Sequence, residues 1–411
     1  MAKSGSRASA GTISALIWLL GLAVFINYVD RGTLGIAAPR MKADLGLSAT
    51  QFGVAASAFF WVYAPGQVLM GWLVGRVNAA WLLAAGLALW GVATALTGLV
   101  GGLVTLVALR LLLGLGEAVA FPAAFKLIVD QVDDARRGAA NSALSIGLAL
   151  GPALGTLAGG LLLASLGWRW LFGAMGLLTL IWLVPWLLLI RRLPGPAAIG
   201  RAAAGPGYWL VLANRPALSL SLVQVCFGFA LYFLVTWLPL WLVDVRHYSL
   251  ADMAWLGSIV FVAQAVAALL VGLVNDRLVA RGQPQERLRR AAAMAGAMAA
   301  AGGVALIGAS NSQSALIAGL VLAGFGFGVQ HVCVNMMAQV FAGPLAAGKW
   351  VGVQNGFGNL AGVANPIITG AIIDATGSYG WAFALAAAGP VIACISLAVL
   401  VPKVAPIDWA A

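Results

Sequence analysis

Residues 14–38 read SALIWLLGLAVFINYVDRGTLGIAA, an apolar stretch that carries the acid Asp30 and the base Arg31 near its end. A helix of about 20 apolar residues can cross the hydrocarbon layer of a bilayer, so this stretch predicts a membrane-spanning helix. It is too long and too polar at its end for a signal peptide, and it has no small-residue cleavage site. We therefore expect it to be retained as the first helix of the folded chain.

Similar stretches fill the rest of the chain. Of its 411 residues, 62% are apolar and only 9% are charged, whereas an ordinary soluble domain carries about 25% charged residues. This composition excludes a soluble enzyme. The predicted fold is an all-α membrane protein with twelve spans, near residues 14–38, 50–74, 79–98, 102–127, 138–164, 169–190, 217–243, 252–275, 290–309, 313–341, 350–374 and 381–401.

Lys and Arg residues are distributed unequally between the two sides of these spans. Most of the 23 basic residues fall in the tails and in the loops of one side, while Arg40, Lys42, Arg169 and Arg246 fall on the other. By the positive-inside rule, both termini are expected in the cytoplasm. The net charge of +11 is scattered over many loops, which argues against a nucleic-acid-binding stripe.

The longest polar interruption, residues 191–216, divides the spans into two sets of six. We predict an N-terminal bundle over 1–190, a cytoplasmic linker over 191–216 and a C-terminal bundle over 217–411. Short patterns repeat in register between the two sets: Gly71-x-x-x-Gly75-Arg76 with Gly272-x-x-x-Asp276-Arg277, Asn141 with Asn355, and Gly151-Pro152 with Asn365-Pro366. This repetition favours a duplicated chain, a plan in which small molecules bind near the membrane midplane between the repeats.

Four charged residues lie inside predicted spans: Asp30, Arg31, Arg110 and Glu117. Each costs about 2.5 to 3.5 kcal/mol at the bilayer centre on insertion scales, so they must be paired or must line a wet space. Arg110 and Glu117 are two helical turns apart and share one face. A purely structural ion-pair network is the alternative to a functional site, but buried pairs are poor at stabilising a fold, which favours function.

Arg31 is the predicted anchor for a ligand, because a planar guanidinium grips a carboxylate with two parallel hydrogen bonds and keeps its charge. The ligand is therefore expected to be an anion. Asp30 and Glu117 are partly desolvated carboxyls that could take up and release protons. Two such acids would allow more than one proton to move with a monovalent anion, which predicts electrogenic transport.

Several motifs resemble those of the anion:cation symporter branch of the major facilitator superfamily. They are the run Ile26-Asn27-Tyr28-Val29-Asp30-Arg31, Leu47-Ser48-x-x-Gln51-Phe52-Gly53, Ser57-x-Phe59-Phe60-Trp61-x-Tyr63-x-x-Gly66-Gln67 and Arg110-x-x-x-Gly114-x-x-Glu117-x-x-x-Phe121-Pro122. The resemblance covers spans one to five closely and the second half more loosely. It implies proton-coupled import of a small organic acid by alternating access, in a bacterial inner membrane.

The same resemblance assigns roles to individual positions. It implies substrate contacts for Tyr28, Arg31, Tyr63 and Asn355, and a proton-coupling cluster of Asp30, Arg110 and Glu117. Gly71, Arg76, Gly272, Asp276 and Arg277 match a gating motif. Two positions depart from the family: Leu148 replaces a pocket glutamine, which makes a six-carbon sugar acid less secure as the substrate, and Gly75 replaces a gating aspartate.

Other polar residues also interrupt the apolar stretches. Gln330, His331 and Asn335 are further candidate binding residues, since positions 331 and 335 share a helix face, although His331 could equally be a packing histidine. Cys226, Cys333 and Cys394 are expected to be packing residues. We expect no metal and no cofactor, because no ligand set or nucleophile, histidine and acid arrangement occurs.

Two rival functions remain. The pattern Gly138-x8-Gly147-x3-Gly151-Pro152-x2-Gly155 is typical of antiporters in the superfamily, and efflux of drugs or metabolites is the first rival. Its simpler interpretation is helix packing with a proline kink. A membrane sensor that binds an organic acid without transporting it is the second rival, but no signalling domain is present. The expected partners are a carboxylate, protons and lipid, with the protein acting as a monomer.

Overall fold

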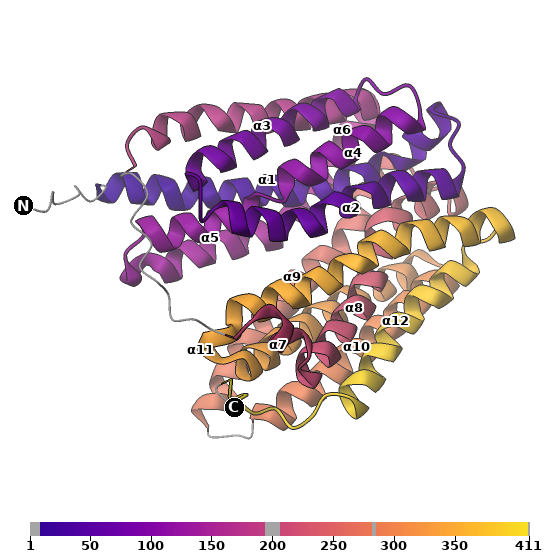
Figure 1. Ribbon diagram of the computed structural model, residues 1–411. Helices are drawn as coiled ribbons and strands as arrows, with labels where there is room; N and C mark the ends of the chain where they lie inside the picture. The colour runs from indigo at the N-terminus through magenta and orange to yellow at the C-terminus, as the bar shows by residue number, and fades with distance from the viewer. Residues whose placement is uncertain (1–8, 194–205, 282–284, 410–411) are drawn as a thin grey trace, which may run out of the picture. The chain divides into compact units, whose positions relative to one another are not determined.

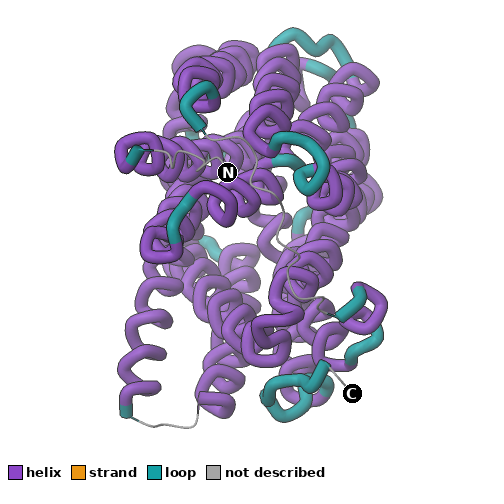
Figure 2. The backbone as a smooth tube through the Cα atoms, turned by 60° about the vertical axis from the view of Figure 1, so that its left-hand side comes forward, coloured by secondary structure: helices purple, strands orange, loops and turns teal. Residues whose placement is uncertain are grey.

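The structure is a computed structural model that describes residues 9–193, 206–281 and 285–409, and nearly all of these residues are helical (Figure 2). Eleven stretches of the described residues are long and apolar enough to cross a membrane. The longest, Arg136–Ile190, consists of two helices joined at Gly167, whose φ of 79° is the left-handed conformation that glycine adopts freely. The predicted all-α, many-span fold is therefore confirmed, including the boundary between the fifth and sixth spans.

The chain folds into two compact units. In the described residues, the first unit consists of 9–47 and 54–193, and the second of 48–53 and 206–409. The helices of the first unit are α1 (Ala10–Asp44), α2 (Ala49–Leu73, from Val54 onward), α3 (Ala79–Thr97), α4 (Leu103–Glu117), α5 (Ala120–Gln131) and α6 (Asp134–Ile190) (Figure 1).

Glycines of α6 let its backbone approach α1 very closely. A Cβ atom added to Gly151 would lie 2.6 Å from Cβ of Tyr28, and one added to Gly155 would lie 2.8 Å from Cα of Val29. Gly147 likewise faces the backbone of Gly21 and Phe25. This is the close packing that small residues allow between membrane helices, and it supports the packing interpretation of the glycine-proline pattern.

The fourth span differs from the prediction of one unbroken helix over 102–127. Helix α4 ends at Glu117 and α5 begins at Ala120. Pro122 has no N–H to donate to the carbonyl of Ala118, and proline fits best in the first turn of a helix, where the N–H would have no partner. The break therefore falls one turn before this proline, directly after Glu117.

The second unit contains the remaining helices. They are α7 (Tyr208–Leu212), α8 (Arg215–Leu240) with the π-turn η1 (Trp241–Val245), α9 (Leu250–Ala280), α10 (Gln285–Ala309), α11 (Gln313–Thr376) and α12 (Gly380–Val399). Helix α11 comprises two spans that meet at Gly343, with a φ of 57°, and the second span begins at Leu345 rather than at the predicted residue 350.

The predicted linker over 191–216 is only partly described. Helix α6 ends at Ile190, and residues 194–205 lie outside the described residues. The short helix α7 was not expected within this segment. It forms because Val211 is fully buried in the hydrophobic core of the second unit, beside Ala217, Leu220 and Trp350.

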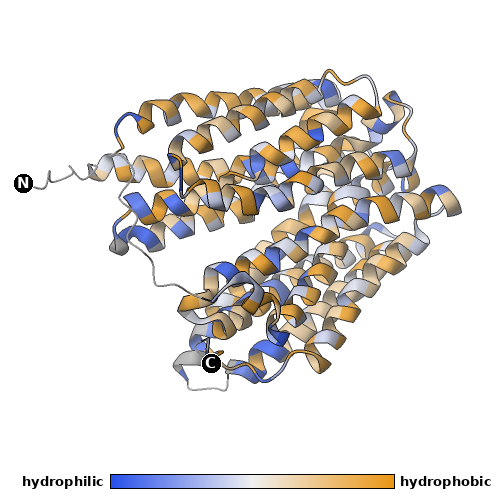
Figure 3. Ribbon diagram, in the orientation of Figure 1, coloured by the Kyte–Doolittle hydropathy of each residue, from blue (hydrophilic) through white to orange (hydrophobic). Residues whose placement is uncertain are grey.

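Hydrophobic residues make up most of the helical ribbon, and many hydrophilic residues lie toward helix ends and loops (Figure 3). Large apolar side chains such as Trp170 and Leu99 are 70% and 79% exposed. A helix in lipid satisfies its own backbone hydrogen bonds and needs an apolar outer face, so these exposed residues fit a lipid-facing surface.

The first turn of α2 belongs to the second unit, where the carboxylate of Asp374 on α11 holds it. Asp374 accepts hydrogen bonds from Ser48 Oγ at 2.9 Å and from the backbone N–H groups of Ala49 and Thr50 at 3.0 and 2.8 Å. The first N–H groups of a helix have no partner within it, so this carboxylate acts as the cap of α2.

Candidate functional site

The four charged residues predicted as a site come together in the first unit from two helices. Asp30 and Arg31 lie on α1, and Arg110 and Glu117 lie on α4. Asp30, Arg110 and Glu117 are 4%, 6% and 1% exposed, while the side chain of Arg31 is 16% exposed. Two acids and two bases make a buried group that is neutral when all four are ionised.

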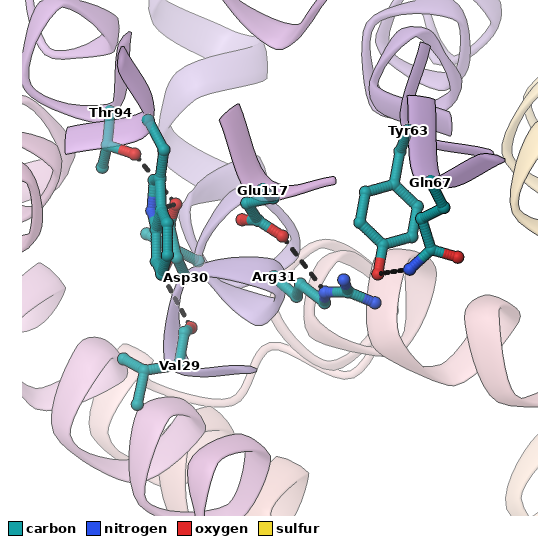
Figure 4. A network of polar contacts seen from close by, with 9 residues as sticks. Val29, Asp30, Arg31, Tyr63, Gln67, Thr94 and Glu117 are labelled. Atoms are coloured by element: carbon teal, nitrogen blue, oxygen red, sulfur yellow. Dashed lines mark hydrogen bonds and ion pairs between the residues drawn. The ribbon is translucent and has the colours of Figure 1, made fainter. Parts of the chain in front are cut away.

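Arg31 lies between an acid and a set of aromatic rings (Figure 4). Its Nε donates to Glu117 Oε2 at 3.2 Å, and its guanidinium carbon lies 4.7 Å from the ring centre of Tyr28 and 4.4 Å from that of Tyr63. Rings at this distance attract a cation through their electron-rich faces. The structure thus brings the predicted residues Tyr28, Arg31 and Tyr63 together.

Tyr63 is itself oriented by its own helix. Gln67 Nε2 donates to the hydroxyl of Tyr63 at 2.7 Å, one turn along α2 (Figure 4). Phe59 precedes Tyr63 by one turn and stacks on it with ring centres 4.9 Å apart. The ring centre of Phe59 also lies 5.6 Å from the guanidinium carbon of Arg31 and 5.1 Å from that of Arg110, so this ring contacts both bases.

Asp30 points away from Arg31 toward α3 (Figure 4). Its Oδ2 accepts hydrogen bonds from Trp90 Nε1 at 3.0 Å and from Thr94 Oγ1 at 2.8 Å. The two acids of the group therefore have different partners: neutral donors hold Asp30, and a cation holds Glu117.

Some polar atoms of the group have no hydrogen-bond partner within the described part of the chain. These atoms include Glu117 Oε1 and Arg110 Nε. Buried polar atoms are normally satisfied, and exceptions are typical of sites where partners change or water enters. Among the described residues, Glu117 therefore has a hydrogen-bond partner at Oε2 and none at Oε1.

The predicted polar set of the second unit is only partly assembled. On α11, Asn335 Nδ2 and His331 Nε2 are 3.0 Å apart, and the ring of Phe227 on α8 stacks on His331 at 5.2 Å. Gln330 is fully buried, and neither of its side-chain polar atoms has a partner within the described ranges. Asn355 is exposed and shares no described contact with this set.

The predicted gating residues are divided between the two units. The guanidinium of Arg76 lies 3.7 Å above the ring of Trp72. Gly71 and Gly272 have open space where a Cβ would lie, and Arg277 is exposed. The side chain of Asp276 lies outside the described residues.

Four residues that contact the site were not predicted as part of it: Phe59, Gln67, Trp90 and Thr94. Phe59 and Gln67 belong to the motif that carried the family resemblance. Trp90 and Thr94 lie in an otherwise apolar stretch without charge, and only their spacing of four residues places them on one face.

The chain is similar to families of known membrane proteins. The Major Facilitator Superfamily model matches residues 20–366. The chain is 28% identical to the probable galactarate/D-glucarate transporter GudP of Bacillus subtilis, with 94% of this chain and 91% of the relative covered. It is 29% identical to the probable sulfoacetate transporter SauU of Cupriavidus necator, with 91% and 90% covered.

Solved structures show the same fold. A bacterial homologue of the human lysosomal transporter Spinster, crystallised in an inward-facing and unoccupied conformation, superposes with a TM-score of 0.77 at 19% identity, and 96% of each chain is covered. The family model spans most of the chain and includes every charged residue of the buried group. The chain therefore belongs to the major facilitator superfamily, as a multi-pass protein of the bacterial inner membrane.

Proposed function

We propose that this protein is a proton-coupled symporter that imports a small organic anion by alternating access. The observation that carries the proposal is Arg31, a partly exposed guanidinium that pairs with Glu117 and is flanked by two tyrosine rings. The relatives support an anionic substrate, since their names refer to transporters of sugar acids and of sulfoacetate.

The geometry suggests how anion and proton binding are linked. An anion that binds Arg31 competes with Glu117 for the same guanidinium. A buried carboxylate that loses the cation to which it is hydrogen-bonded is costly, so Glu117 takes up a proton as the anion binds. The proton then offsets the charge that the anion adds to a neutral group.

Release reverses these events when the site opens to the cytoplasm. A proton that leaves Glu117 restores the carboxylate, which competes again for Arg31 and displaces the anion. Because the gradient drives protons inward, the anion is carried inward with them. Rocking of repeated halves about a central site is the motion that this plan uses.

Efflux by antiport has no observation in its favour beyond the glycine-proline pattern. In the first unit, these glycines are accounted for by the close approach of α6 to α1. Efflux of cationic substrates would also give Arg31 no role.

Thermal-shift screening of the purified protein against sugar acids, aromatic acids and short hydroxy acids tests the proposal. We expect one class of carboxylate to stabilise the wild-type protein and to have no effect on Arg31→Ala. Arg169→Ala is the matched control, because Arg169 is an exposed base that pairs with Asp44 at 3.2 Å, outside the buried group. Stabilisation that survives in Arg31→Ala would contradict the anchor role.

A further inference from the structure

The two buried acids are held by chemically different partners, and this difference divides their roles. Trp90 Nε1 and Thr94 Oγ1 both donate to Oδ2 of Asp30. Trp90 and Thr94 are 0% and 1% exposed, and they lie one turn apart on α3, so one helix face presents both donors. For Glu117, the hydrogen bond found within the described part of the chain comes from the cation Arg31 and not from a neutral donor.

A hydrogen bond donated to an ionised carboxylate stabilises its charged form. The hydroxyl of Thr94 could turn and accept a hydrogen bond from a protonated acid, whereas an indole N–H can only donate. Trp90 therefore favours the ionised form of Asp30 whatever the orientation of the Thr94 hydroxyl.

The charged groups that face Asp30 are few. Arg31 lies next to it on α1, and Arg110 and Glu117 interact with it from α4. Helix α3 has no titratable residue between Ala79 and Thr97, and α6 has none between 138 and 164. On α5, which also contacts α1, Lys126 pairs with Asp130. Asp30 thus has two neutral hydrogen-bond donors on α3, in addition to the charges of Arg31, Arg110 and Glu117.

We infer that Trp90 and Thr94 are positioning residues that let Asp30 stay ionised at a lower pH than it would without these two hydrogen bonds. Glu117 is then the acid whose protonation responds to the ligand of Arg31. The first part of this inference concerns the protein without substrate, and its consequence for transport rests on the proposed function. In transport, Asp30 would supply the second protonation step, and α3 would set the pH at which that step occurs.

Infrared titration of the purified protein tests this role, because a carboxylic acid and a carboxylate absorb at different frequencies. The signal that disappears in Asp30→Asn identifies Asp30. We expect Thr94→Val and Trp90→Phe each to move the midpoint of this signal to higher pH by about one unit, since each removes one charge-assisted hydrogen bond. Thr94→Ser, which keeps the hydroxyl, should titrate like the wild type.

Thr97→Val is the matched control. Thr97 is also buried on α3, but its hydroxyl donates to Ala93 O of its own helix at 2.8 Å. An unchanged midpoint in both Thr94→Val and Trp90→Phe would overturn the inference, as would an equal shift in Thr97→Val. The titration needs no substrate, so a shift in a protein that transports no organic anion would support the positioning role and contradict the proposed function.

Discussion

A buried acid with one hydrogen-bond donor and a buried acid with two donors respond differently when one donor is lost. Glu117 depends on Arg31 alone among its described hydrogen bonds, whereas Asp30 keeps Trp90 and Thr94 whatever happens to Arg31. Loss of one partner therefore changes the charge state of Glu117 more readily than that of Asp30. We therefore propose Glu117 as the carrier of the proton that is linked to anion binding.

Glu117→Gln should separate anion binding from proton movement. The amide keeps the size of the side chain and can still accept from Arg31, but it cannot exchange a proton. In proteoliposomes we expect exchange of the anion across the membrane to persist, while accumulation driven by an imposed pH gradient falls to the level measured without a gradient. Glu286→Gln is the matched control, since Glu286 accepts from the N–H of Val404 away from the buried group. Gradient-driven accumulation that survives in Glu117→Gln would rule out this carboxyl as the coupling site.

The charged part of the site could be predicted from the sequence because charge inside an apolar stretch is conspicuous. Asp30, Arg31, Arg110 and Glu117 were found in this way, and the structure places them within one group. Trp90 and Thr94 could not be found, since an indole and a hydroxyl in an apolar helix are common and their target is 60 and 64 residues away. The pairing depends on which face of α3 meets α1, and no local pattern specifies that face.

Helix α1 carries Asp30 and Arg31, and its position depends on α6. Gly147, Gly151 and Gly155 leave no room for a side chain between the two helices. Contacts this close rely on van der Waals packing, because lipid provides no hydrophobic drive for helix association. The same glycines that suggested antiport thus serve to place the charged residues of α1.

Gly151→Ala should destabilise the first unit by about 2 kcal/mol, since a Cβ at this position would lie 2.6 Å from Cβ of Tyr28 and overpacking typically costs 1 to 3 kcal/mol. Thermal unfolding in detergent measures the effect. Gly138→Ala on the same helix is the control, because no atom lies within 4 Å of its added Cβ. Equal melting temperatures for the two variants would show that the close contact does not hold α1.

Helix boundaries could be predicted where glycine or charge marks them, and not elsewhere. The break near residue 167 follows from the glycine there. The break after Glu117 was missed because its cause, Pro122, acts through the carbonyl of Ala118, one turn earlier. Helix α7 was missed because its support comes from residues distant in the sequence: Val211 is buried in the core that contains Trp350, and Leu212 packs against it.

The hydrogen bonds between Asp374 and the first turn of α2 can also be tested by mutation. Asp374→Ala removes all three hydrogen bonds to the first turn of α2, and loss of a helix cap costs about 1 kcal/mol. We expect a lower unfolding temperature for this variant. Asp133→Ala is the control, because Asp133 precedes α6 without a side-chain cap bond. An equal fall of the unfolding temperature in both variants would contradict the capping role of Asp374.

Among the described residues, the charged side chains that are buried all lie in the first unit. The first unit holds the buried group of two acids and two bases, whereas the second unit offers Gln330, His331 and Asn335 as its candidate polar residues. If a monovalent anion moves with one proton, no net charge crosses the membrane. If Asp30 carries a second proton, one positive charge moves inward, which is worth about 2.3 kcal/mol per 100 mV.

We therefore expect uptake to respond to membrane potential. In proteoliposomes loaded with potassium, valinomycin should raise the initial rate of anion uptake when the interior becomes negative. Asp30→Asn that retains anion exchange should lose this response, because only the Glu117 proton remains. Uptake by the wild-type protein that is unchanged by the imposed potential would contradict the second proton.

The glycine contacts between α6 and α1 also limit how the protein can adapt to its ligand. A helix whose backbone touches its neighbour over three successive turns cannot roll about its own axis without a steric clash. We therefore expect adjustment to a ligand to come from the rotamers of Arg31 rather than from rotation of α1. If Arg31 anchors the anion as we propose, we expect the conformations of this one side chain to decide which lengths of anion the protein accepts.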